Sequence, residues 1–125
     1  SSSSMDSNIM AIDLKIMQSL KDIAGEDDEY FITEIIDNYL LESPEKLQLL
    51  INAIAENNVE ELVKVAHGLG SSSISIGANN LAKICREIEA IAKTGKNVDS
   101  ETIIPQLKFE YQQVEIALIK IKNNG

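Results

Sequence analysis

His67 is the single histidine of the 125-residue sequence, and an unusual run of small residues follows it. The run reads Gly68-Leu69-Gly70-Ser71-Ser72-Ser73, and Ile74 comes next. Each glycine in a helix interior costs about 0.5–1 kcal/mol relative to alanine, so helices rarely carry such a run. A neutral imidazole is nucleophilic near pH 7, and small neighbours leave it accessible. The pattern therefore predicts a reactive histidine on a bare surface.

The helix expected around His67 directs this side chain outward. Its core-facing stripe recurs at three- and four-residue steps and consists of Val59, Leu62, Ala66, Leu69 and Ser73. At about 100° per residue, His67 falls roughly 120° from the middle of that stripe. Lys64 precedes it on the surface ridge, and Gly70, Ser71 and Ile74 follow. A histidine that only fills surface remains an alternative, but it leaves the small residues unexplained.

The sequence offers no other chemistry. One histidine and one cysteine cannot form a zinc site of the usual composition within a single chain. No glycine-rich loop follows a strand to cradle nucleotide phosphates, and no serine or cysteine is paired with a base. Cys85 falls on the inward stripe of its helix and is expected to be a core residue. We therefore expect neither a metal nor a cofactor on this chain.

Composition limits the class of partner. The net charge of −9 argues against nucleic acid and anionic membranes, which both bind basic surfaces. Tryptophan is absent and aromatic residues make up only 4%, so a platform for base stacking is not expected. No apolar stretch approaches the roughly 20 residues that span a bilayer, and a lone cysteine is typical of the reducing cytoplasm. We expect a cytoplasmic monomer that acts on other proteins.

Helical periodicity runs through nearly the whole chain and predicts an all-α fold. Ser1 to Ser4 precede Met5 and are interpreted as an artificial, disordered start, so residues 1–5 lie outside the fold and 6–125 form one domain. Gly25, Ser43-Pro44, Asn57-Asn58, Gly77 and Gly95 are expected to separate six helices. The predicted segments are residues 12–24, 27–40, 44–56, 59–76, 79–93 and about 101–121. Short connections favour an antiparallel up-and-down four-helix bundle of the last four, with the first two packed over one end.

The residues around His67 resemble the histidine-containing phosphotransfer (HPt) domain. That family's motif places a leucine two residues after the histidine, then small residues, Gly-Ala, a leucine, a cysteine and an apolar-Glu pair. The matching positions are His67, Leu69, Ser72, Ser73, Gly77, Ala78, Leu81, Cys85, Ile88 and Glu89. The resemblance covers about residues 12–93. It departs at two positions, where Gly70 and Ser71 replace the family's Lys-Gly pair.

The resemblance implies a phosphorelay intermediate of two-component signal transduction. His67 would be the phosphoacceptor: it would take a phosphoryl group from the aspartate of a receiver domain and pass it to another receiver. The Mg²⁺ of such a reaction belongs to the receiver, and no element for ATP-dependent kinase activity is present. Lys64 is a candidate for the missing charge at the phosphoryl group. The partner would dock on Gly68, Gly70, Ser71, Ser72 and Ile74.

Two alternatives remain open at this stage. The first is a degenerate or structural helical adaptor that docks receiver-like partners without phosphotransfer. The second is the dimerisation domain of a histidine kinase. Against the second, an acidic residue normally follows that histidine, and Gly68 follows here.

Overall fold

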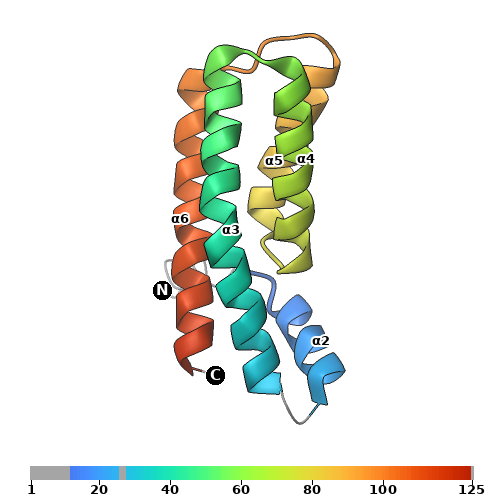
Figure 1. Cartoon of the computed structure of the whole chain (residues 1–125), viewed down its shortest axis with the longest axis vertical. Coiled ribbons are helices and arrows are strands. Elements are labelled where there is room, and N and C mark those ends of the chain that lie inside the picture. Colours follow the sequence, from blue (N-terminus) through green and yellow to red (C-terminus); the bar gives the residue numbers. More distant parts are fainter. Residues whose placement is uncertain (1–11, 26–27, 125) are drawn as a thin grey trace, which may run out of the picture.

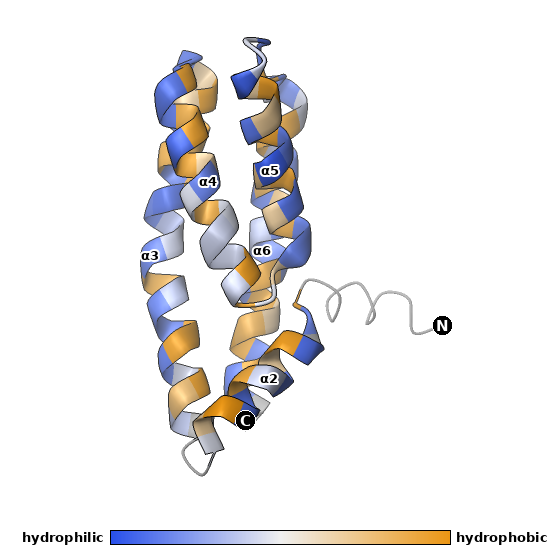
Figure 2. Ribbon diagram, turned by 90° about the vertical axis from the view of Figure 1, so that its right-hand side faces the viewer, coloured by the Kyte–Doolittle hydropathy of each residue, from blue (hydrophilic) through white to orange (hydrophobic). Residues whose placement is uncertain are grey.

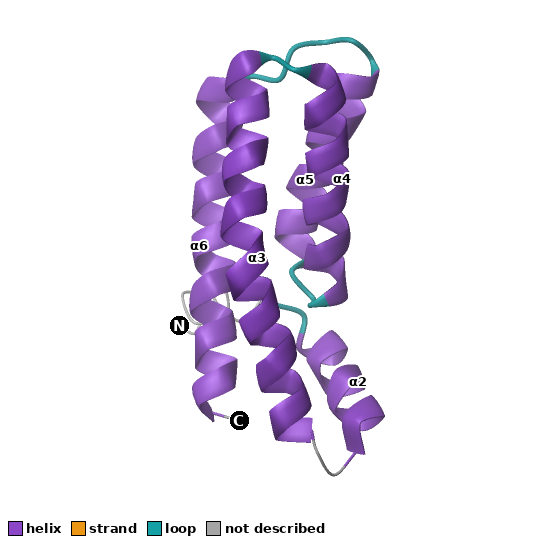
Figure 3. Ribbon diagram, in the orientation of Figure 1, coloured by secondary structure: helices purple, strands orange, loops and turns teal. Residues whose placement is uncertain are grey.

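The structure, a computed structural model, describes residues 12–25 and 28–124. Within these ranges the chain is helical apart from turns and short loops (Figure 3), which confirms the all-α prediction. The expected disordered start at residues 1–5 lies outside the described residues. The helices are α2 (Leu14–Ala24), α3 (Asp28–Glu56), α4 (Val59–Ser75), α5 (Asn79–Lys93) and α6 (Ser100–Asn124).

Four of these helices, α3 to α6, form an antiparallel up-and-down bundle (Figure 1). Each packs against two neighbours, in the order α3, α4, α5, α6 and back to α3. The fifth, α2, packs beside the first half of α3, below the turn between α4 and α5. The predicted four-helix bundle is therefore confirmed, although one separate N-terminal helix accompanies it where two were expected.

The second expected N-terminal helix is the first half of α3, and the predicted break at Ser43-Pro44 is wrong. Pro44 lies inside α3, where it cannot donate a backbone hydrogen bond and normally costs about 3 kcal/mol. Burial on both sides of it, at Tyr39 and Leu50, keeps the helix continuous. Ser43 does not cap a helix; its buried hydroxyl pairs with that of Tyr111 on α6 at 2.7 Å.

The segment before α2 is fastened to the turn between α4 and α5. The backbone N–H of Asp13 donates to the carbonyl of Gly77 at 2.7 Å. The Asp13 carboxylate accepts from the backbone of Lys15 at 2.9 Å and from the side chain of Asn79 at 3.2 Å. One aspartate thus caps α2 and contacts the first residue of α5. Gly77 has φ of +87°, a left-handed conformation that favours glycine.

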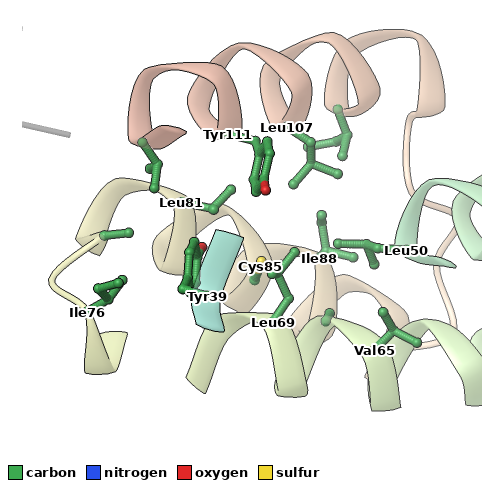
Figure 4. Packing of buried hydrophobic residues seen from close by; sticks show 14 of the residues in the cluster. Tyr39, Leu50, Val65, Leu69, Ile76, Leu81, Cys85, Ile88, Leu107 and Tyr111 are labelled. Carbon is green, nitrogen blue, oxygen red and sulfur yellow. The ribbon is translucent and has the colours of Figure 1, made fainter. Parts of the chain in front are cut away.

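The core lies between the helices of the bundle, and Figure 4 shows its side chains from α3, α4, α5 and α6. Met17 of α2 also belongs to it. Leu50, Leu69, Leu81, Ile88 and Leu107 are among its fully buried members. The predicted inward stripe of α4 holds for four of its five residues, whereas Val59, the first residue of the helix, is 41% exposed. Cys85 is buried as expected, and burial raises the pKa of its thiol to about 12.

Two buried hydroxyl pairs cross the bundle. Tyr39 on α3 and Ser73 on α4 are 2.8 Å apart, oxygen to oxygen. Ser43 on α3 and Tyr111 on α6 form the second pair. Burying a hydroxyl without a partner costs about 1–3 kcal/mol, so each pair satisfies two groups that the core would otherwise penalise.

No helix among the described residues is long and apolar enough to cross a membrane.

Candidate functional site

His67 lies near the middle of α4, and its side chain points away from the core. The helix begins as predicted, with the Asn58 side chain accepting from the backbone N–H of Glu61 at 3.3 Å. From that start the helical period turns Leu62, Ala66 and Leu69 inward. The His67 side chain is 71% exposed, which confirms its predicted outward direction.

One carboxylate holds one edge of the His67 ring. Glu89 on α5 places Oε1 3.4 Å from the His67 Nδ1, while its other oxygen, Oε2, accepts from the Lys93 ammonium at 2.8 Å. Glu89 is only 16% exposed, so its carboxylate is fixed between the two partners. The pKa of the Glu89 carboxyl is lowered, chiefly by the hydrogen bond from Lys93 and less by His67, against the opposing effect of burial. Glu89 therefore stays ionised at neutral pH.

The small residues after His67 serve two different purposes. Gly70 is buried, and a Cβ added there would lie 3.3 Å from the Cys85 Cβ, so its glycine lets α4 approach α5 closely. Ser73 is also buried and bonds Tyr39. Gly70 therefore does not belong to the exposed face on which the sequence interpretation put it. A side chain at this position would begin close to Cys85, and α5 would have to move by a few tenths of an ångström to admit it.

The other small residues lie at the surface. A Cβ added to Gly68 would meet nothing within 4 Å, and Ser71 is exposed. Ser72 is half-buried and accepts from the Lys46 ammonium of α3 at 3.1 Å. Ile74 is half-buried as well. The pale lower half of α4 in Figure 2 corresponds to the stretch of glycine and serine that follows His67.

Lys64 is exposed and one turn before His67 on α4, as the sequence indicated. No ion pair of Lys64 occurs within residues 12–25 and 28–124. Its suggested contact with a phosphoryl group stays a prediction.

Sequence reasoning missed the roles of Glu89 and Lys93. Glu89 was matched only as a motif position, although its four-residue spacing from Lys93 is a recognisable ion-pair pattern on a helix. What the sequence could not supply was the register between α4 and α5, which places Glu89 opposite His67.

The arrangement can support nucleophilic chemistry at one nitrogen. Because Glu89 faces Nδ1, the other ring nitrogen, Nε2, is the one that this carboxylate leaves free. A carboxylate at Nδ1 favours the tautomer with its proton there, which leaves the lone pair on Nε2. No group of three or more metal-ligating side chains occurs in the described part of the chain.

Comparison with known proteins agrees with the fold and the motif. The model of the Hpt domain family matches residues 34–117, which include His67, Glu89 and Lys93. The phosphorelay intermediate protein rdeA of Dictyostelium discoideum is 28% identical over 100 residues, covering 80% of this chain but 39% of the relative. The chain thus spans about two fifths of that protein's length.

The solved structure of histidine-containing phosphotransfer protein B (HptB) from Pseudomonas aeruginosa PAO1 has a similar fold. It superposes with a TM-score of 0.79 at 24% identity, covering 92% of this chain and 96% of that one. At this level of identity, the match establishes the helical architecture.

Proposed function

This chain belongs to the Hpt domain family, and on that premise we propose that it is a phosphorelay intermediate that carries a phosphoryl group on His67. The observation that carries the proposal is a His67 side chain that is 71% exposed and is contacted at Nδ1 by the ionised Glu89. The kinship with a protein named as a phosphorelay intermediate supports the same role.

In the proposed reaction, the lone pair of the His67 Nε2 attacks the phosphorus of a receiver's aspartyl phosphate. The N–P bond forms while the bond between phosphorus and the aspartate oxygen breaks, and its electron pair leaves with the carboxylate. The proton on Nδ1 stays in place, so the product ring carries a positive charge. Transfer to a second receiver is the same exchange with the nucleophile and leaving group reversed.

Glu89 contributes in two ways to this step. Before attack it favours the reactive tautomer, and after attack its negative charge stabilises the cationic ring. It is a positioning residue, since it contacts the nucleophile's ring and not the phosphorus. Phosphoryl transfer depends mostly on alignment and charge, so a site of this simplicity is adequate.

The proposed docking surface is the exposed side of α4 around His67. Gly68 and Ser71 leave the ring uncovered, and Ile74 offers an apolar contact. Ser72 lies further around α4, where it bonds Lys46 of α3. We propose that a receiver domain, carrying its own Mg²⁺, packs here in the cytoplasm with this protein as a monomer.

The proposal is tested by the acid and base stability of phosphate transferred to this chain. Incubation with a ³²P-phosphorylated receiver domain should transfer label to this chain in a form that acid releases and base leaves intact, as expected of an N–P bond. Adding a second, unphosphorylated receiver should then remove it. A protein that binds the receiver but never takes label is an adaptor, and the proposal is then wrong.

Changing Glu89 should slow transfer without abolishing it. The variant Glu89→Leu loses the contact with Nδ1, and we expect about a tenfold lower transfer rate, since a charged hydrogen bond at a partly exposed site is worth about 1–2 kcal/mol. The matched variant Glu89→Gln keeps an acceptor oxygen and should retain more activity than Glu89→Leu. ¹⁵N spectra of the ring should show the Nδ1–H tautomer decreasing in Glu89→Leu. Equal rates in all three proteins would show that this contact has no role.

A further inference from the structure

Lys93 is separated from the reactive ring by a single carboxylate. Its ammonium binds one oxygen of Glu89 while the other oxygen contacts His67, so the three side chains form a continuous row across α4 and α5. Lys93 is much more exposed to solvent than Glu89: the Lys93 side chain is 61% exposed, and that of Glu89 is 16% exposed. Glu89 is thus held in place, whereas the Lys93 ammonium can leave it without moving the backbone.

The direction of the helices puts Lys93 on the side where a phosphoryl group would lie. Side chains in a helix lean toward its N-terminus, so a phosphoryl group on the His67 ring is expected toward the start of α4. Because α5 runs antiparallel to α4, the residue one turn after Glu89 lies on that same side. That residue is Lys93.

The negative charge of a phosphoryl group on His67 requires a nearby cation. A phosphoryl group brings roughly −1.5 to −2 charges at pH 7, and it would stand beside the ionised Glu89. Position 70 cannot supply a cation, since it is a buried glycine in contact with Cys85. Lys64 is on the same side but has no partner within the described residues that fixes it near the ring.

We propose that Lys93 is the residue that binds the phosphoryl group on His67, exchanging Glu89 for the phosphoryl oxygens when the N–P bond forms. This inference rests on the proposed function of His67. In the exchange the ammonium keeps its three protons and no covalent bond changes beyond those of the transfer itself. Glu89, no longer bound to Lys93, then pairs with the cationic His67 ring. The negative phosphoryl group and the positive ring each have a partner of opposite charge.

The test measures the charge felt by the phosphoryl group and does not depend on a receiver. Phosphoramidate, a small phosphoryl donor, is used to label His67, and the ³¹P chemical shift is followed against pH. A cation beside the group lowers its pKa, so Lys93→Met should raise the phosphoryl pKa by about half a unit or more. Lys93→Arg should restore the value of the unmodified chain.

Two matched variants separate Lys93 from other lysines. Lys83→Met removes the same charge from the same helix but faces the shallow groove between α5 and α6, and it should leave the titration unchanged. Lys64→Met tests the other candidate cation, and it should shift the phosphoryl pKa less than Lys93→Met does. A shift in Lys64→Met with none in Lys93→Met would overturn the inference and assign the cation to Lys64.

A second measurement distinguishes failure of this inference from failure of the proposed function. Transfer from a phosphorylated receiver should be about tenfold slower in Lys93→Met and should lose part of its dependence on salt concentration. A chain that accepts phosphate from phosphoramidate with the expected pKa shift but never from any receiver would contradict the relay and leave the role of Lys93 intact. Normal transfer and an unchanged titration in Lys93→Met would contradict the role of Lys93 alone.

Discussion

The variant His67→Gln is expected to take no detectable label from a phosphorylated receiver, a loss of at least about a thousandfold. Glutamine has a similar reach, but its amide nitrogen is not nucleophilic because its lone pair is delocalised into the carbonyl. The chain has no second histidine that could replace the first.

The fold of this variant should be unaffected. The His67 side chain is 71% exposed and contacts Glu89 only at the edge of its ring, so its replacement opens no cavity. Thermal unfolding followed by circular dichroism should therefore match that of the unmodified chain within about 2 °C. Acid-labile label that persists in a folded His67→Gln protein would refute the assignment of the phosphoacceptor.

The second large effect is expected on stability, in Gly77→Ala. An alanine at φ of +87° is strained by about 1–2 kcal/mol. Its Cβ would also lie 3.0 Å from the Asp13 carbonyl oxygen and 3.2 Å from the Asp13 nitrogen, and backbone atoms cannot yield as a flexible side chain can. Together these terms should lower the free energy of unfolding by about 3 kcal/mol and the melting temperature by about 10 °C.

The matched control is Gly95→Ala, in the loop between α5 and α6. Gly95 has φ of +80°, but a Cβ there would meet nothing within 4 Å. Gly95→Ala therefore adds backbone strain without a steric contact, and it should lower the free energy of unfolding by only about 1 kcal/mol. Urea unfolding of the two variants gives the comparison. Equal losses would mean that the contact with Asp13 contributes nothing and that the segment before α2 is not held by this turn.

Much of the architecture follows from local patterns. Apolar residues at helical spacing located the bundle helices, and Asn58 and Gly95 marked ends that the structure has. The exposure of His67 followed from the same periodicity. Ser43-Pro44 misled because local propensity favours a helix start there, while burial around Pro44 and the hydroxyl pair with Tyr111 keep α3 continuous.

The site was predicted less completely because it joins two helices. Periodicity says which way a residue on α4 points, but not which residue of α5 it meets. Hence Gly70 was expected at the surface, whereas it lies against Cys85. Glu89 and Lys93 likewise carried no signal of their contact with the ring until α5 was placed beside α4.

The two hydroxyl pairs have a consequence for the direction of the His67 ring. A hydrogen bond is directional, so the bond between the hydroxyls of Tyr39 and Ser73 adds to apolar packing in restraining the rotation of α4 about its own axis. Ser73 lies about 120° around α4 from His67, so the buried bond that fixes Ser73 also restrains the direction in which the His67 side chain leaves the helix. The orientation of the nucleophile thus depends in part on a hydrogen bond inside the core.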